Sequence, residues 1–205
     1  MNILNDLRDR AYNTAKSKGW YDGKIITFGE RISLVHSELS ELLEGYRNGY
    51  SPNESIYAED GKPLGSDSEA VDVLVRFLDM CGYYELDIDK AFSNLYINVD
   101  SNKISTIQSL NELRDYVFNL WGGILKNKEI PFCQFINILH CEVSKCNVAG
   151  YFTEGTTLGV VEQIAQSINM LFKFCGYYKI DIDRAIKEKM DYNDKRSYRH
   201  GKKLL

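Results

Sequence analysis

An internal repeat constrains the fold of this 205-residue chain more than any other feature of its sequence. Residues 4–9 (LNDLRD) recur as 110–115 (LNELRD), 36–38 (HSE) as 140–142 (HCE), and 81–84 (CGYY) as 175–178 (CGYY). Blocks that recur in the same order indicate an architecture built from repeated structural units. The sequence therefore predicts two copies of one unit, residues 1–104 and residues 105–205.

The hydrophobic pattern of the first unit predicts helices at about residues 3–17, 28–46, 68–83 and 87–95. In the second of these, apolar residues recur at the spacing of one helix face, for example Ile32, Val35 and Leu39. We see no convincing strand alternation anywhere in the chain. We therefore expect an all-α helical bundle in which the two tandem repeats pack as an intrachain pseudo-dimer.

The composition is that of an ordinary globular protein, with 44% apolar and 26% charged residues. No apolar run reaches the roughly 18 residues that span a bilayer, and the charged N-terminus does not resemble a signal peptide. The five cysteines show no C-x-x-C spacing, which argues against a zinc ribbon or a disulfide framework. We expect a cytoplasmic protein with free thiols and no membrane partner.

The net charge of −4 is unevenly distributed between the units. Residues 1–104 hold 18 acids and 11 bases, a net charge of −7, and residues 105–205 hold 11 acids and 14 bases, a net charge of +3. Most of the basic excess lies in the C-terminal segment. A basic tail can bind nucleic acid, but the negative net charge argues against a nucleic-acid partner.

The predicted helix at residues 68–83 carries an unusual polar stripe. It is apolar around most of its circumference, yet Glu69, Asp72, Arg76 and Asp79 share one stripe roughly 80° wide. Carboxylates on a buried helix are costly unless a positive group faces them. The stripe therefore predicts a cation at this face.

A second acidic pair, Glu38 and Glu41, lies on the preceding predicted helix. Such a pair is weak evidence alone, because many helices carry acids on a solvated face. If the two helices pack antiparallel, however, four carboxylates converge: Glu38, Glu41, Glu69 and Asp72. An oxygen-only ligand set suits Mg²⁺ or Mn²⁺ rather than zinc, and Mg²⁺ usually shares its ligand shell with substrate phosphates.

The second unit has lost this acidic set. Aligned on CGYY, the counterparts of Glu69 and Asp72 are Gln163 and Gln166, and the counterpart of Glu41 is Lys145. We therefore expect one metal site in each chain.

These motifs resemble the MazG-like, all-α nucleoside triphosphate pyrophosphohydrolase superfamily, whose pattern is E-x-x-E followed by E-x-x-D. The resemblance extends to Lys62-Pro63, to Arg76 and Asp79, and to a basic C-terminal signature matched by Lys189, Asn193, Arg196, His200, Gly201 and Lys202. It implies that the four acids bind Mg²⁺ and that a nucleoside triphosphate is cleaved between its α and β phosphates.

The resemblance also implies roles for single residues. Glu41 would act as the catalytic base, and the substrate-binding residues would be Lys189, Asn193, Arg196 and Lys202, with Trp20 or a tyrosine stacking on the base. In simple family members one unit carries both the acids and the basic signature. Here the first unit has Leu95 where the second has Lys189, so we expect one composite site assembled from both halves.

Two other functions stay open at this point. The chain could be a non-catalytic nucleotide sensor or regulatory module, since its second unit has already lost the acids. It could also be a helical nucleic-acid-binding protein that uses the basic tail. The identity of the base, the sugar and the oligomeric state, including a homodimer of the tandem chain, are not determined by the sequence.

Overall fold

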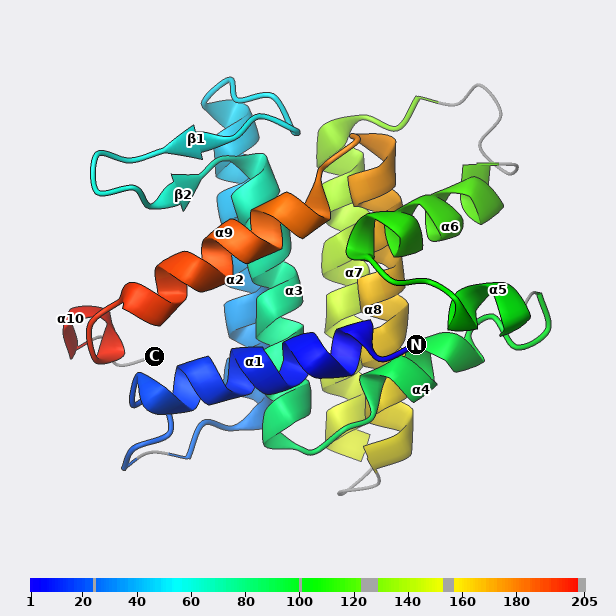
Figure 1. Cartoon of the computed structure of the whole chain (residues 1–205), viewed down its shortest axis with the longest axis horizontal. Helices are drawn as coiled ribbons and strands as arrows, with labels where there is room; N and C mark the ends of the chain where they lie inside the picture. The colour runs from blue at the N-terminus through cyan, green and yellow to red at the C-terminus, as the bar shows by residue number, and fades with distance from the viewer. Residues whose placement is uncertain (24, 100, 123–128, 153–156, 203–205) are drawn as a thin grey trace.

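The computed structural model describes residues 1–23, 25–99, 101–122, 129–152 and 157–202, which form an all-α bundle as predicted (Figure 1). The first repeat contains α1 (Ile3–Ser17), α2 (Phe28–Arg47), α3 (Ser66–Tyr83) and α4 (Ile88–Asn94). The second contains α6 (Leu110–Gly122), α7 (Phe132–Phe152), α8 (Thr157–Tyr177) and α9 (Ile182–Lys195). Two short helices are α5 (Ser101–Ser105) and α10 (Arg199–Lys202). In the described ranges, no helix combines the length and the apolar character that a membrane crossing needs.

The expectation of a chain without strands is wrong at one loop. A small hairpin between α2 and α3 pairs β1 (Ile56–Tyr57) antiparallel with β2 (Pro63–Leu64). Strands of two residues are too short to show the alternation by which strands are recognised.

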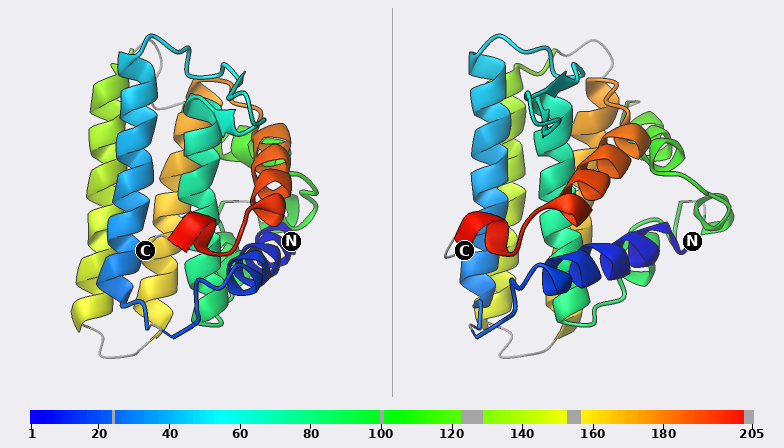
Figure 2. Two further views of the ribbon diagram at one scale, coloured as in Figure 1. Left: turned by 90° about the vertical axis from the view of Figure 1, so that its left-hand side faces the viewer. Right: turned by 60° about the vertical axis from the view of Figure 1, so that its left-hand side comes forward.

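The helices form three layers (Figure 2). α2 and α7 pack side by side in the first layer, and α3 and α8 form the second. α1, α4, α6 and α9 cross the outer face of the second layer. The apolar core fills the space between layers, with Leu39 on α2, Phe77 on α3 and Phe172 on α8 fully buried. Burial on both faces explains why α3 and α8 are apolar around most of their circumference.

The two repeats exchange their last helices. α4 of the first repeat packs on α8 of the second, and α9 of the second packs on α3 of the first. Arg10 on α1 also reaches α9, where its guanidinium lies 2.8 Å from Asp191 and 2.9 Å from Asp194. Helix α9 is thereby held against α3, the helix that carries Glu69 and Asp72.

Equivalent residues of the two repeats make equivalent hydrogen bonds. The Asp89 carboxylate accepts from the backbone N–H of Asn5 at 2.8 Å, and the Asp183 carboxylate accepts from that of Asn111 at 3.1 Å. Each aspartate thus satisfies a free N–H in the first turn of a helix. The aspartates belong to the sequence DID, which occurs at residues 87–89 and again at 181–183. These contacts explain why DID recurs together with the LNxLRD sequence of residues 4–9 and 110–115.

The glycine of each CGYY sequence allows two helices to approach closely. A Cβ added at Gly82 would lie 2.5 Å from the Cβ of Tyr12, and one added at Gly176 would lie 2.6 Å from that of Phe118. Side-chain carbons do not approach so closely, so a glycine is required at both α1–α3 and α6–α8 crossings.

The repeats also meet at equivalent histidines. His36 on α2 and His140 on α7 stack with their ring planes 13° apart and their Nδ1 atoms 2.8 Å apart. Together with the shared hydrogen bonds and glycines, this pairing supports the arrangement of two related halves. The pseudo-dimer itself stays a prediction.

Candidate functional site

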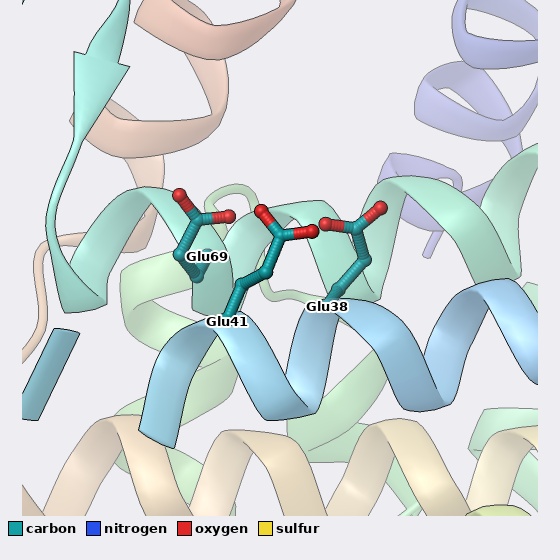
Figure 3. Close-up of side chains that lie close together, drawn as sticks. All are labelled: Glu38, Glu41 and Glu69. Atoms are coloured by element: carbon teal, nitrogen blue, oxygen red, sulfur yellow. The ribbon is translucent and has the colours of Figure 1, made fainter. Parts of the chain in front are cut away.

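Three carboxylates meet between α2 and α3, which run antiparallel (Figure 1). Glu38 and Glu41 from α2 and Glu69 from α3 each offer an oxygen within 4.8 Å of the others. Figure 3 shows the three side chains pointing to the same side of the two helices. Glu38 and Glu69 are buried, whereas Glu41 is exposed. This acidic cluster, Glu38, Glu41 and Glu69, is therefore open to solvent on one side.

The local sequence sets the position and rotation of α2. Thr27 and Glu30 form a capping box, in which the Thr27 hydroxyl accepts from the Glu30 N–H and the Glu30 carboxylate accepts from the Thr27 N–H. The capping box fixes the residue at which α2 begins. Leu39 is fully buried, and Glu38 and Glu41 on the same helix bring their carboxylates to that of Glu69 on α3.

The fourth predicted acid, Asp72, makes a different contact. Its Oδ2 lies 2.6 Å from the Nζ of Lys189 on α9, and Lys189 also donates to the Ser68 hydroxyl at 2.9 Å. The Lys189 side chain is 3% exposed and that of Asp72 is 15% exposed. The structure thus brings three of the four acids into one group and pairs the fourth with a base from the other repeat.

Burial shifts the titration of this site. It raises the pKa of Glu69 to about 7, although Lys189 opposes the shift. Burial also raises the pKa of Glu38, which Arg76 opposes by donating from Nε to Glu38 Oε1 at 2.9 Å. Burial disfavours the charge on Lys189, but Asp72 and Glu69 outweigh it and raise the pKa of the ammonium. The carboxylates therefore outnumber the cations that face them.

Replacing Glu69 by Gln should stabilise the metal-free protein. Because the folded-state pKa lies near 7 and the ordinary value is 4.5, the folded protein holds a proton that the unfolded chain releases. Stability from this group is fully present below pH 4.5 and is lost as the pH rises through 7. At pH 8 we expect Glu69→Gln to raise the free energy of unfolding by on the order of 2 kcal/mol.

Urea unfolding in EDTA at pH 5 and pH 8 measures this effect. The substitution should change the free energy of unfolding little at pH 5 and clearly at pH 8. With Mg²⁺ present, the wild type should be more stable than the variant, since only the wild type keeps all three carboxylate ligands. An equal stability difference at both pH values would contradict the assigned environment of Glu69.

A cavity of about 100 Å³ lies between α1, α3 and the C-terminal segment, and Asp72 and Arg76 line it. The predicted substrate-binding residues Trp20, Asn193 and Arg196 line it. The Trp20 ring meets that of His200 edge-on at 5.0 Å, and the Arg196 guanidinium lies 5.1 Å from the Tyr192 ring. The backbone of Lys202 belongs to α10, but its side chain lies outside the described residues.

Sequence reasoning missed two residues at the inner end of this cavity. Tyr21 donates its hydroxyl to Asp79 Oδ1 at 2.5 Å, and Arg31 donates from Nη1 to the Tyr21 hydroxyl at 3.1 Å. The Arg31 guanidinium also lies 4.0 Å from the centre of the Tyr83 ring. The available signal was a charged residue on the apolar face of α2, since Arg31 is 5% exposed.

Comparisons of the chain with protein-family models, with curated proteins and with solved structures found no match.

Proposed function

We propose that this chain is a Mg²⁺-dependent nucleoside triphosphate pyrophosphohydrolase with one composite site. It would convert an NTP or dNTP to the monophosphate and pyrophosphate. The observation that carries the proposal is the meeting of three carboxylates from the first repeat with Lys189 of the second, 2.6 Å from Asp72. Acids for a divalent cation and a base for a phosphate thus lie side by side. The resemblance of the motifs to the MazG-like superfamily supports the same reaction.

The residues present suit a hard divalent cation. Glu38, Glu41 and Glu69 offer oxygen atoms only, close enough together to bind one ion. Two of the three are buried, so a cation would offset the cost of desolvating their charge. When bound, Mg²⁺ or Mn²⁺ supplies polarisation of the phosphate oxygens.

The protein side chains divide the remaining tasks. Glu41 is exposed and can take a proton from a water molecule whose oxygen bonds to the α-phosphorus. The bond from that phosphorus to the bridging oxygen breaks, and pyrophosphate leaves. Lys189 and Arg196 would neutralise phosphate charge. Lys189 pairs with Asp72 beside the acidic cluster, and Arg196 lines the cavity. Trp20 offers a ring against which a base can stack.

A panel of NTPs, dNTPs and modified nucleotides tests the proposal. With Mg²⁺ we expect at least one of them to yield monophosphate and pyrophosphate in equal amounts, and no turnover in EDTA. Release of inorganic phosphate instead would indicate cleavage at another bond and would contradict the proposal. Nucleotide binding without turnover across the panel would favour the non-catalytic sensor.

A further inference from the structure

The cavity that Asp72 lines follows α3 for two turns. Asp72, Arg76 and Asp79 line it in sequence order. At 1.5 Å per residue, Asp79 lies about 10 Å beyond Asp72 along the helix axis. A nucleotide whose α-phosphate lies at the acids would therefore place its base near Asp79.

Asp79 is held rigidly at this inner end. Its Oδ1 accepts from Tyr21, and its Oδ2 lies 3.6 Å from Arg31 Nη1. Tyr21 stacks on Tyr83 with ring centroids 5.2 Å apart, and Arg31 covers the same Tyr83 ring. Packing on both sides fixes the orientation of the carboxylate.

One oxygen of Asp79 is left to meet a ligand. The side chain is 19% exposed and lines the cavity, and no hydrogen bond from the described residues reaches its Oδ2. The Tyr21 hydroxyl is already committed to Oδ1, so it has no proton to offer a ligand. Burial raises the pKa of the Asp79 carboxyl, and the Tyr21 hydrogen bond and the charges of Arg31 and Arg76 oppose that shift. In its ionised form the carboxylate only accepts hydrogen bonds. The free oxygen of Asp79 therefore suits a ligand group that donates a hydrogen bond.

The pyrimidine bases differ in whether they present a hydrogen-bond donor or an acceptor to such a carboxylate. Cytosine presents an amino group, from which carboxylates characteristically accept, whereas uracil and thymine present the carbonyl oxygen O4 at the same position. A carbonyl there would face a carboxylate without a proton between them.

We infer that the Asp79 carboxylate accepts a hydrogen bond from the nucleotide base. The site therefore binds cytosine nucleotides in preference to uracil and thymine nucleotides. The inference deepens the proposed function and depends on it for the orientation of the nucleotide. It makes Asp79 a specificity-determining residue and assigns Tyr21 and Arg31 the role of positioning it.

Calorimetric titration of the protein with dCMP, dUMP and dTMP in EDTA tests the inference. We expect dCMP to bind about tenfold more tightly than dUMP or dTMP. In Asp79→Asn, whose amide can donate as well as accept, the ratio of dCMP to dUMP affinity should fall to about one. Tyr21→Phe keeps the stacked ring but frees the carboxylate, so it should lower the ratio by a few fold.

Asp9→Asn is the matched control, because Asp9 is exposed and, within the part of the chain that the structure describes, pairs with its neighbour Arg8 alone. This variant should keep the wild-type ratio. Equal or tighter binding of dUMP by the wild type, or an unchanged ratio in both Asp79→Asn and Tyr21→Phe, would overturn the inference. Since these titrations involve no turnover, failure here is distinct from failure to release pyrophosphate, which would reject the proposed function.

Discussion

Replacing Glu41 by Gln is expected to lower the rate of pyrophosphate release about 1000-fold. The substitution keeps the size of the side chain but removes a ligand oxygen charge from the acidic cluster and the group that would accept the proton of water. Because Glu41 is the exposed member of the cluster, its loss should change the free energy of unfolding by no more than about 0.5 kcal/mol. The measurements are pyrophosphate release at saturating nucleotide and urea unfolding in EDTA.

Glu44→Gln provides the control for this variant. Glu44 lies one turn further along α2, is exposed, and pairs with Arg47 at 2.7 Å. It carries the same charge on the same helix but does not belong to the acidic cluster. We expect it to keep wild-type activity. If the two variants lose activity equally, or if Glu41→Gln stays within a few fold of the wild type, Glu41 is not the base.

Replacing Lys189 by Met is expected to destabilise the metal-free protein by about 3 kcal/mol, because breaking a buried ion pair leaves Asp72 without its partner. The same substitution should tighten Mn²⁺ binding by about tenfold, since it removes a positive charge beside the cation site. Opposite effects of one substitution on stability and on metal affinity would show that Lys189 balances the acids in the absence of metal. Urea unfolding in EDTA and calorimetric titration with Mn²⁺ measure the two quantities.

Lys187→Met is the comparison for Lys189. It lies on the same helix, is 74% exposed, and pairs with Asp191 at 2.8 Å. Exposed pairs contribute little, so both its stability and its Mn²⁺ affinity should match the wild type. Weaker Mn²⁺ binding by Lys189→Met would mean that Lys189 supports the metal site rather than competing with a cation there.

Helix positions could be predicted closely, whereas partners across helices could not. The predicted first helix, residues 3–17, is α1, and the third begins two residues earlier than expected, at Ser66. Periodicity determines which face of a helix is buried. It does not determine which cation meets a given acid, and the ion pair of Asp72 with Lys189 joins residues from different repeats.

The contacts of Asp79 in the cavity could not be predicted from the sequence for the same reason. Asp79 was visible as a member of the polar stripe on α3, but its partners Tyr21 and Arg31 come from the segment after α1 and from α2. No spacing rule connects residues on three separate elements. Their association is a product of tertiary packing, as is the hairpin that lies against α9.

The exchange of the last helices also has a consequence for how the protein is made. During translation α9 is synthesised after all four acids of the site. Its residue Lys189 follows Asp72, the last of these acids, by more than a hundred residues. While the first repeat emerges and folds, the Asp72 carboxylate lacks the Lys189 ammonium, and the part of α3 that α9 later covers is exposed. The composite site is therefore completed only after α9 has been synthesised, so a nascent chain that holds all four carboxylates but lacks α9 would not yet carry the proposed site.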